Sequence, residues 1–307
     1  MDLTASLPYA QVFYFYLSTL TFNLYRMPKL KKPLTLGIII PAYNEEYQIE
    51  ACLNHIANQT VMPDQVILVN NNSTDNTAQF AKKYRFVRVI NEKKQGIVHA
   101  RNAGFNACKS DIIGRIDADT WLPNDWVERV KQFYGNKKSA DTAITGGGYF
   151  TNLVFPPDRV NGLALDLIAF RFNRLIMGHY ILWGSNMAMH RSDWQKVKQY
   201  VCGANDIHED LDLAIHLHQI GIKVKYVPSL IVGVKMKRVL DEWSNLFGNL
   251  MWWPRTLRRH GNWRWVFGMA GAYTLLIFSV ALFLLNKPII IIKKSFNGFF
   301  RTQTQEP

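Results

Sequence analysis

Two aspartates with one residue between them, Asp117 and Asp119, are the first side chains in this sequence whose type and spacing predict chemistry. They follow an apolar run, residues 111–116, that is typical of a buried strand. Because side chains alternate along a strand, we expect both carboxylates on one side of its end. Such a pair repels unless a cation lies between them, and carboxylate oxygens suit a hard divalent ion that carries phosphates. An isolated D-x-D is more often only an acidic turn, so the surrounding elements must decide.

Short β-branched runs alternate with helical patterns from Leu34 onward. The patterns predict strands at 34–40, 65–69, 87–90 and 112–116, with helices at 47–59, 77–84 and 97–108. Such alternation is typical of an α/β fold with a doubly wound, mostly parallel sheet. The carboxyl ends of parallel strands share one edge, so the polar loops 41–46, 70–76 and 117–119 should converge there.

The rest of the central region gives weaker patterns. We expect a helix that ends near Tyr134, a strand at 143–150 in which glycines 146–148 allow close backbone approach, an apolar helix at 160–178 and a helix at 212–220. With 307 residues, 48% hydrophobic and 19% charged, the chain is long enough for one large domain with appendages and is not disordered.

Cysteine usage and charge indicate the compartment. The three cysteines, Cys52, Cys108 and Cys202, have no paired or metal-type spacing, so we expect them to be reduced and buried in a cytosol-facing domain. The formal net charge is +13, but the excess lies in residues 1–32 and 235–307 while the middle is almost neutral. That distribution favours a membrane surface over nucleic acid as the partner.

Four motifs, in this order, resemble the family 2 glycosyltransferases of the GT-A fold. They are Pro41-Ala42-Tyr43-Asn44-Glu45-Glu46, Asn72-Ser73-Thr74-Asp75, Gly96 with Ala100-Arg101-Asn102-Ala103-Gly104, and Asp117-Ala118-Asp119. The resemblance covers roughly residues 34–235. It implies a Rossmann-like nucleotide-sugar domain of the GT-A type, with membrane-associated helical flanks in this chain.

The resemblance also implies roles on the donor side. Pro41, Tyr43 and Glu45 would border the nucleotide, and Asn70 stands where the family has an Asp that faces the base. An Asn carbonyl can still accept from an imide N–H, so uridine stays the favoured base. Further along, Arg101 would lie beside the diphosphate or steady the carboxylates. In Asp117-Ala118-Asp119, Asp117 would face ribose and metal, and Asp119 would hold Mn²⁺ or Mg²⁺ against the diphosphate.

On the acceptor side, Trp183-Gly184-Ser185-Asn186 resembles the family's G-x-N segment. Gly184 would allow close approach, and Asn186 would offer paired hydrogen bonds to sugar hydroxyls; an ordinary core strand is the alternative. Glu209-Asp210 matches the family's E-D pair. Asp210 would be the general base, while Glu209 would position a hydroxyl or a loop. The neighbouring His208 is more often a plain loop residue than a ligand.

The flanks carry the membrane predictions. Residues 1–33 form an apolar, then basic segment that we interpret as an interfacial helix rather than a span, with a core helix as the alternative. Residues 235–264 mix Trp and Arg as interfacial helices do. Residues 265–292 predict a transmembrane or re-entrant segment, and 293–307 a basic, polar tail. A Q-x-x-R-W motif, typical of processive family members, is missing, so we expect one sugar per event.

These observations predict an inverting, metal-dependent glycosyltransferase at the cell membrane, with its catalytic domain facing the cytoplasm. The donor would be a nucleotide-sugar, with UDP favoured, and the acceptor a hydroxyl of a lipid-linked or cell-envelope glycan. Two alternatives stay open. One is a polyprenyl-phosphate glycosyltransferase, whose ionised acceptor needs no base. The other is a nucleotide-binding module without turnover.

Overall fold

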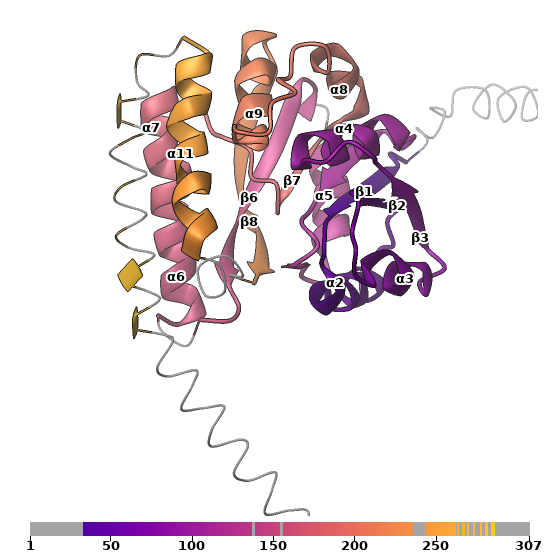
Figure 1. Ribbon diagram of the computed structural model, residues 1–307. Coiled ribbons are helices and arrows are strands. Elements are labelled where there is room, and N and C mark those ends of the chain that lie inside the picture. The colour runs from indigo at the N-terminus through magenta and orange to yellow at the C-terminus, as the bar shows by residue number, and fades with distance from the viewer. Residues whose placement is uncertain are drawn as a thin grey trace, which may run out of the picture. The chain divides into compact units, whose positions relative to one another are not determined.

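The computed structural model describes residues 33–136, 139–153, 156–235 and 243–261, with isolated positions as far as Leu285 (Figure 1). Residues 1–32 of the predicted N-terminal segment, most of the predicted span at 265–292 and the tail at 293–307 lie outside the described residues. In the described part of the chain, no helix combines the length and the apolar character that crossing a membrane requires. The membrane assignments therefore stay predictions.

One eight-stranded sheet organises the domain, in the order β3-β2-β1-β4-β7-β6-β8-β5. Its strands are β1 Leu36–Ala42, β2 Gln65–Asn70, β3 Val87–Asn91, β4 Ile112–Arg115, β5 Thr120–Trp121, β6 Thr142–Phe150, β7 Met187–His190 and β8 Lys223–Val234. The helices are α2 Glu46–Ala57, α3 Thr77–Lys82, α4 Ile97–Ala107, α5 Trp126–Gly135, α6 Asp158–Leu165, α7 Asn173–Met177, α8 Arg191–Val197, α9 Glu209–Gln219 and α11 Trp243–Arg259.

The first half of the sheet is parallel, as the sequence predicts. β1 lies between β2 and β4, with Ile38 opposite Val66 on one side and Gly114 on the other. Every residue of β1 is buried, which is why it reads as an unbroken apolar run rather than an alternating one. Three pairings in the second half are antiparallel: β4 with β7, β6 with β7, and β5 with β8.

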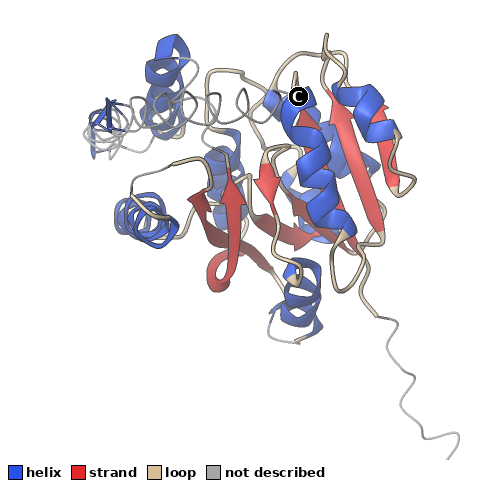
Figure 2. Ribbon diagram, turned by 90° about the horizontal axis from the view of Figure 1, so that it is seen from below, coloured by secondary structure: helices blue, strands red, loops and turns tan. Residues whose placement is uncertain are grey.

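Helices cover both faces of this sheet (Figure 2). Ile38 and Ile40 pack with residues of α2 and α5, including Leu53 and Trp126. The intervening Ile39 packs on the other face with residues of α4 and α9, such as Phe105. Burial on both faces fixes the position of β1 and of the loop that follows it.

The glycines of β6 allow close packing, as predicted. A Cβ at Gly146 would lie 2.1 Å from the carbonyl oxygen of Leu230, and one at Gly148 would lie 2.6 Å from the Trp183 ring. The expected apolar helix at 160–178 is divided: a π-helical segment, Asp166–Phe172, separates α6 from α7. Gly178, at φ 81°, ends α7 in the left-handed conformation.

Helix α11 lies beside α7 and α9 (Figure 1). Its Trp253 and Leu257 are buried against Leu211 and Ile215 of α9. The prediction of an interfacial helix at 235–264 missed this contact, because a Trp- and Arg-rich face looks the same in a sequence whether it meets lipid or protein.

Candidate active site

The loops after β1 and β2 are joined by hydrogen bonds at the carboxyl edge of the sheet. Oδ1 of Asn44 accepts from the N–H of Thr74 at 2.8 Å, and Oγ of Ser73 accepts from the N–H of Asn44 at 3.1 Å. Oε2 of Glu46 accepts from the N–H of Asn76 at 3.1 Å. The predicted convergence of the first two polar loops is confirmed.

The buried thiol of Cys52 lies near the third loop, residues 117–119. Burial raises the pKa of this thiol, and the negative charges of Asp119, Asp117 and Glu45 raise it further. These three carboxylates, from the first and third loops, therefore lie close enough to act on one buried atom. Carboxylates gathered in this way can attract a cation.

Asp117 and Asp119 lie on a turn rather than on the strand. β4 ends at Arg115, so the strand alternation that we expected to align the two carboxylates does not apply to them. Instead Asp117 is held by two neighbours: Oδ1 accepts from Nη2 of Arg115 at 2.9 Å, and Oδ2 accepts from Oγ of Ser185 at 2.5 Å. We expected the alternation of a strand to place both carboxylates on one side, and that reason was wrong because neither residue belongs to β4.

Arg115 is a site residue that the sequence did not reveal. Its side chain is 3% exposed, and its guanidinium bridges Asp117 and Glu209, with Nη2 lying 2.9 Å and 3.0 Å from their oxygens. Burial opposes the charge, but Asp117, Glu209 and Asp210 outweigh it and raise the pKa of Arg115. The only sequence signal was an arginine at the end of an otherwise apolar strand.

Arg101 and Glu209 form a buried ion pair behind this layer. Nη1 of Arg101 lies 2.5 Å from Oε2 of Glu209, and the two side chains are 0% and 6% exposed. The carboxylate that Arg101 contacts belongs to Glu209, and both roles expected for Arg101 stay predictions. The buried Glu209 side chain joins Arg101 to Arg115.

Asp210 lies at the start of α9, which begins at Glu209 and not at residue 212 as expected. Its Oδ2 accepts from the N–H of Gly184 at 3.1 Å. Its Oδ1 accepts from the N–H of Leu211 at 2.8 Å and is 3.5 Å from Nδ1 of His208. Burial opposes ionisation, but the contact and charge of His208, then Arg115 and the Gly184 N–H, hold the pKa of Asp210 at about 2. The Asp210 side chain is 17% exposed, so part of it faces solvent.

The acceptor segment differs from the prediction. Asn186 is fully buried: its Oδ1 accepts from the Trp126 indole, and its Nδ2 donates to the carbonyls of Gly147 and Leu230, each at 2.9 Å. Both amide atoms are therefore used in the core, and the paired hydrogen bonds to sugar hydroxyls are not possible in this arrangement. The Trp183 ring is half-buried and lies edge-on to Phe170.

The remaining donor-side residues divide by exposure. Tyr43 is 50% exposed and is accessible to a base, whereas Pro41 is buried within β1 and Ala118 is buried in the core. Asn70 is half-buried: its Oδ1 accepts from the N–H of Ser73 at 3.2 Å, and its Nδ2 donates to Asn91 at 3.1 Å. Pro41 and Ala118 could therefore meet a nucleotide only through their backbone.

The acidic turn fits a hard divalent cation. Asp117 and Asp119 offer only oxygen donors, as Mg²⁺ and Mn²⁺ prefer. The carboxylates of Asp117, Glu209 and Asp210 lie close enough to Arg115 to raise its pKa, and Asp119 adds a further carboxylate to the turn. Burial is the main cause of the raised pKa of the Cys52 thiol, and the negative charges of Asp119 and Asp117 add to it. Asp117 and Asp119 are the residues that would hold the ion.

Residues 37–197 match the model of glycosyl transferase family 2, and this span is just over half of the chain. The chain therefore belongs to that family. Chondroitin synthase from Pasteurella multocida (strain Pm70) is 35% identical over 128 residues, which cover 40% of this chain and 13% of that protein. The chain spans only 17–34% of the length of the first curated relatives that it matches.

Two solved structures confirm the GT-A type of fold. The mannosyltransferase PcManGT from Pyrobaculum calidifontis, in complex with GDP-Man and Mn²⁺, has a TM-score of 0.54 at 17% identity, and the match covers 90% of this chain and 88% of that one. TarS 1–349 of S. aureus, in complex with UDP-GlcNAc, has a TM-score of 0.52 at 16% identity, with 66% and 58% covered.

Proposed function

We propose that this protein is an inverting, metal-dependent glycosyltransferase that moves a sugar from a nucleotide diphosphate sugar to a hydroxyl of a lipid-linked or cell-envelope glycan. The observation that carries the proposal is Asp210: an ionised, partly exposed carboxylate that Gly184 orients and that shares Arg115 with the acidic turn. In glycosyl transfer, a base serves the attacking oxygen and a cation serves the leaving oxygen. Here the candidate base and the candidate cation site are linked through the charge of Arg115.

The loops at residues 41–46 and 70–76 would bind the nucleotide of the donor. Tyr43 is exposed and can cover a base, while Glu45 can accept from base or ribose. The Asn70 carbonyl has a second lone pair beyond its bond to Ser73, so it can accept the imide N–H of uracil. UDP-GlcNAc bound to TarS supports a UDP-sugar, while GDP-Man bound to PcManGT keeps a guanine nucleotide as the competing donor.

The leaving group departs at the acidic turn. A divalent cation, when bound, neutralises the diphosphate as its bond to the sugar breaks. The protein's part is to hold the ligands still: Arg115 and Ser185 fix the two oxygens of Asp117, and Glu209 in turn fixes Arg115. Preorganised charge of this kind needs no rearrangement during the reaction.

Asp210 serves the attacking oxygen. Its carboxylate accepts the proton of the acceptor hydroxyl as that oxygen attacks the anomeric carbon opposite the leaving diphosphate, and the configuration inverts. The N–H of Gly184 orients Oδ2, and the N–H of Leu211 and the ring of His208 orient Oδ1. Because no Q-x-x-R-W motif occurs, we propose one sugar per event.

The low pKa of Asp210 favours one competing function. A carboxylate with a pKa of about 2 is ionised but weakly basic, whereas a polyprenyl-phosphate acceptor is already ionised and needs no base. The basic flanks would suit such a membrane-embedded acceptor and support a place on the cytoplasmic side of the membrane.

Asp210→Asn tests these functions. For a hydroxyl acceptor, sugar transfer should fall on the order of 100- to 10,000-fold, while Mn²⁺-dependent UDP stabilisation in a thermal-shift assay stays unchanged. Near-normal turnover would remove Asp210 from the mechanism and favour the polyprenyl-phosphate acceptor. Asp141→Asn, which changes an exposed carboxylate paired with Lys196, is the matched control. If the wild-type chain neither transfers nor hydrolyses any nucleotide-sugar that it binds, it is a binding module.

A further inference from the structure

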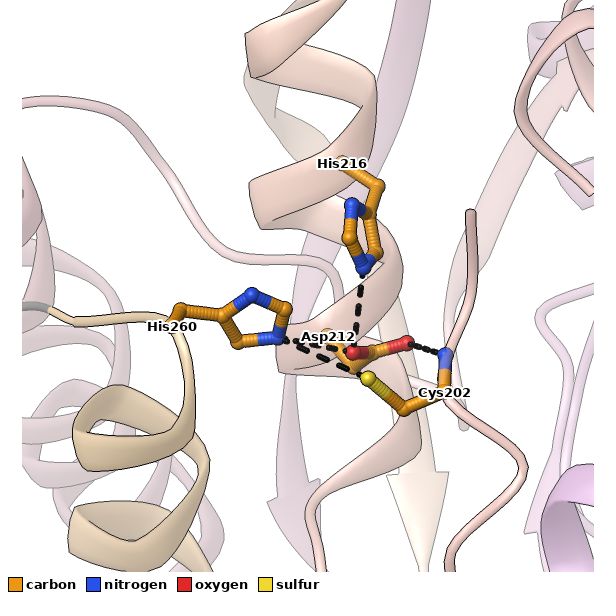
Figure 3. A group of neighbouring side chains, drawn as sticks. All are labelled: Cys202, Asp212, His216 and His260. Atoms are coloured by element: carbon orange, nitrogen blue, oxygen red, sulfur yellow. Dashed lines mark hydrogen bonds and ion pairs between the residues drawn. The ribbon is translucent and has the colours of Figure 1, made fainter. Parts of the chain in front are cut away.

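A second cluster of metal-type side chains lies outside the candidate active site (Figure 3). Cys202 comes from the loop after α8, Asp212 and His216 from α9, and His260 from the turn that follows α11. One ligand atom from each of the four lies within 4.8 Å of all the others. The proposed glycosyl transfer uses none of these residues.

The four ligand atoms lie close together. Asp212 and His216 are four residues apart on α9 and so share one face, with Nε2 of His216 lying 3.5 Å from Oδ1 of Asp212. Nε2 of His260 lies 2.8 Å from the same oxygen and 4.0 Å from Sγ of Cys202. In a tetrahedral zinc site with bonds of about 2.0–2.3 Å, ligand atoms lie roughly 3.3–3.6 Å apart. The observed separations bracket that range.

The ring of His216 is oriented for ligation. Its Nδ1 lies 3.0 Å from Oε1 of Gln219, a carbonyl oxygen, so Nδ1 carries the proton and the lone pair of Nε2 points into the cluster. Nε2 is buried and makes no hydrogen bond within the described part of the chain. A buried imidazole nitrogen aimed at a thiol and a carboxylate suits a cation at the centre.

We propose that Cys202, Asp212, His216 and His260 bind one Zn²⁺. Thiolate and imidazole ligands select zinc over the Mg²⁺ or Mn²⁺ that the oxygens of Asp117 and Asp119 would take. On binding, the Cys202 thiol releases its proton to solvent, so the ion, one thiolate, one carboxylate and two neutral imidazoles sum to zero charge. A neutral centre is the arrangement that burial permits, since Asp212 is 0% exposed.

Four protein ligands close the coordination sphere, which marks a structural site. The ion would tie the end of α11 and the loop before α9 to the first turns of α9. That loop already contacts α11, since the N–H of His208 donates to Oγ1 of Thr256 at 2.9 Å and Arg259 pairs with Asp206 at 3.4 Å. Zinc would thus help to position the backbone that leads into Asp210.

The test measures zinc rather than sugar transfer. The full chain, purified without a metal-affinity column and stripped with a chelator, is given Zn²⁺ and then dialysed against a competing chelator. Retention of one zinc per chain is expected; loss of all zinc would overturn the proposal. With Co²⁺ in place of Zn²⁺, a cobalt–thiolate charge-transfer band is expected, and Cys202→Ser should abolish it. A band that survives in Cys202→Ser would also overturn the proposal.

Two further variants keep the test sound if Cys202→Ser does not fold. Gln219→Ala removes the exposed partner of His216 and should lower zinc affinity about 10- to 100-fold. His218→Gln changes an exposed histidine on the same helix and should leave zinc binding intact. Equal zinc affinity in Gln219→Ala and His218→Gln would contradict the geometry. No nucleotide or Mn²⁺ enters these measurements, so failure of the zinc site leaves the proposed function untouched.

Discussion

The backbone N–H of Gly184 donates to Oδ2 of Asp210 at 3.1 Å, so the loop before β7 orients the candidate base. The same glycine leaves space for Arg115, because a Cβ at position 184 would lie 1.0 Å from Nη1 of that guanidinium. Gly184 thus orients the carboxylate of Asp210 and leaves room for the guanidinium of Arg115. The close approach that the sequence predicted at Gly184 is made by an arginine of the protein.

Gly184→Ala should therefore disable the enzyme. The methyl group must displace Arg115, which loosens Asp117 and Glu209 together, and a shift of about 1 Å in such a site can lower turnover on the order of 100-fold. Turnover and thermal stability should be measured side by side. Gly135→Ala is the control, since a Cβ there would meet no described atom within 4 Å. Normal turnover in Gly184→Ala would refute the role assigned to Arg115.

Glu209→Gln tests the buried ion pairs. The change leaves the guanidiniums of Arg101 and Arg115 buried without the carboxylate that they share, and breaking such a pair costs about 3–5 kcal/mol of unfolding free energy. A domain of this size should lose roughly 10 °C in Tm.

Glu50→Gln is the matched control for that change. Its ion pair with Lys83 is exposed on both sides, and such pairs contribute about 0–1 kcal/mol. Calorimetry of the two variants should separate them clearly. Equal stabilities would mean that Glu209 does not hold the two arginines together.

The fold was predictable because it depends on patterns that lie within short stretches of sequence. The alternation of strands and helices from β1 to β4 set the edge where loops 41–46, 70–76 and 117–119 meet. Individual roles were harder to predict, since they depend on partners far along the chain. Asn186 looked suited to a sugar, yet its amide is used by Trp126 and two carbonyls.

The sequence analysis did not identify Arg115 or the cluster of Cys202, Asp212, His216 and His260, and the reason is the same for both. Arg115 forms an ion pair with Glu209, which lies 94 positions further along the chain. Local spacing in the sequence does not predict a contact over that distance. Cys202 has no partner at metal-type spacing, because its neighbours Asp212 and His260 come from a helix and from a distant turn. We expected all three cysteines to be reduced and buried; all are free, but Cys202 is only half-buried.

His208→Gln should change the pH profile. His208 lowers the pKa of Asp210 more than Arg115 does, so its loss raises that pKa from about 2 toward or above the usual 3.9 or so of an aspartate. The acidic limb of kcat/KM, which reports the free enzyme, should then move to higher pH. A profile identical to that of the wild type would show that His208 does not set the pKa of Asp210. His218→Gln serves as the control.

Asp119→Asn should weaken the response to metal. The substitution removes one negative charge from the acidic turn but keeps the size of the side chain, so the fold should persist. We expect the Mn²⁺ concentration needed for UDP to raise the Tm to increase by at least the ~10- to 100-fold that loss of an outer-shell partner costs. Asp125→Asn, whose exposed carboxylate pairs with Arg129, controls for surface charge. An unchanged Mn²⁺ requirement in Asp119→Asn would move the cation away from this turn, because a ligand cannot lose its charge without a change in affinity.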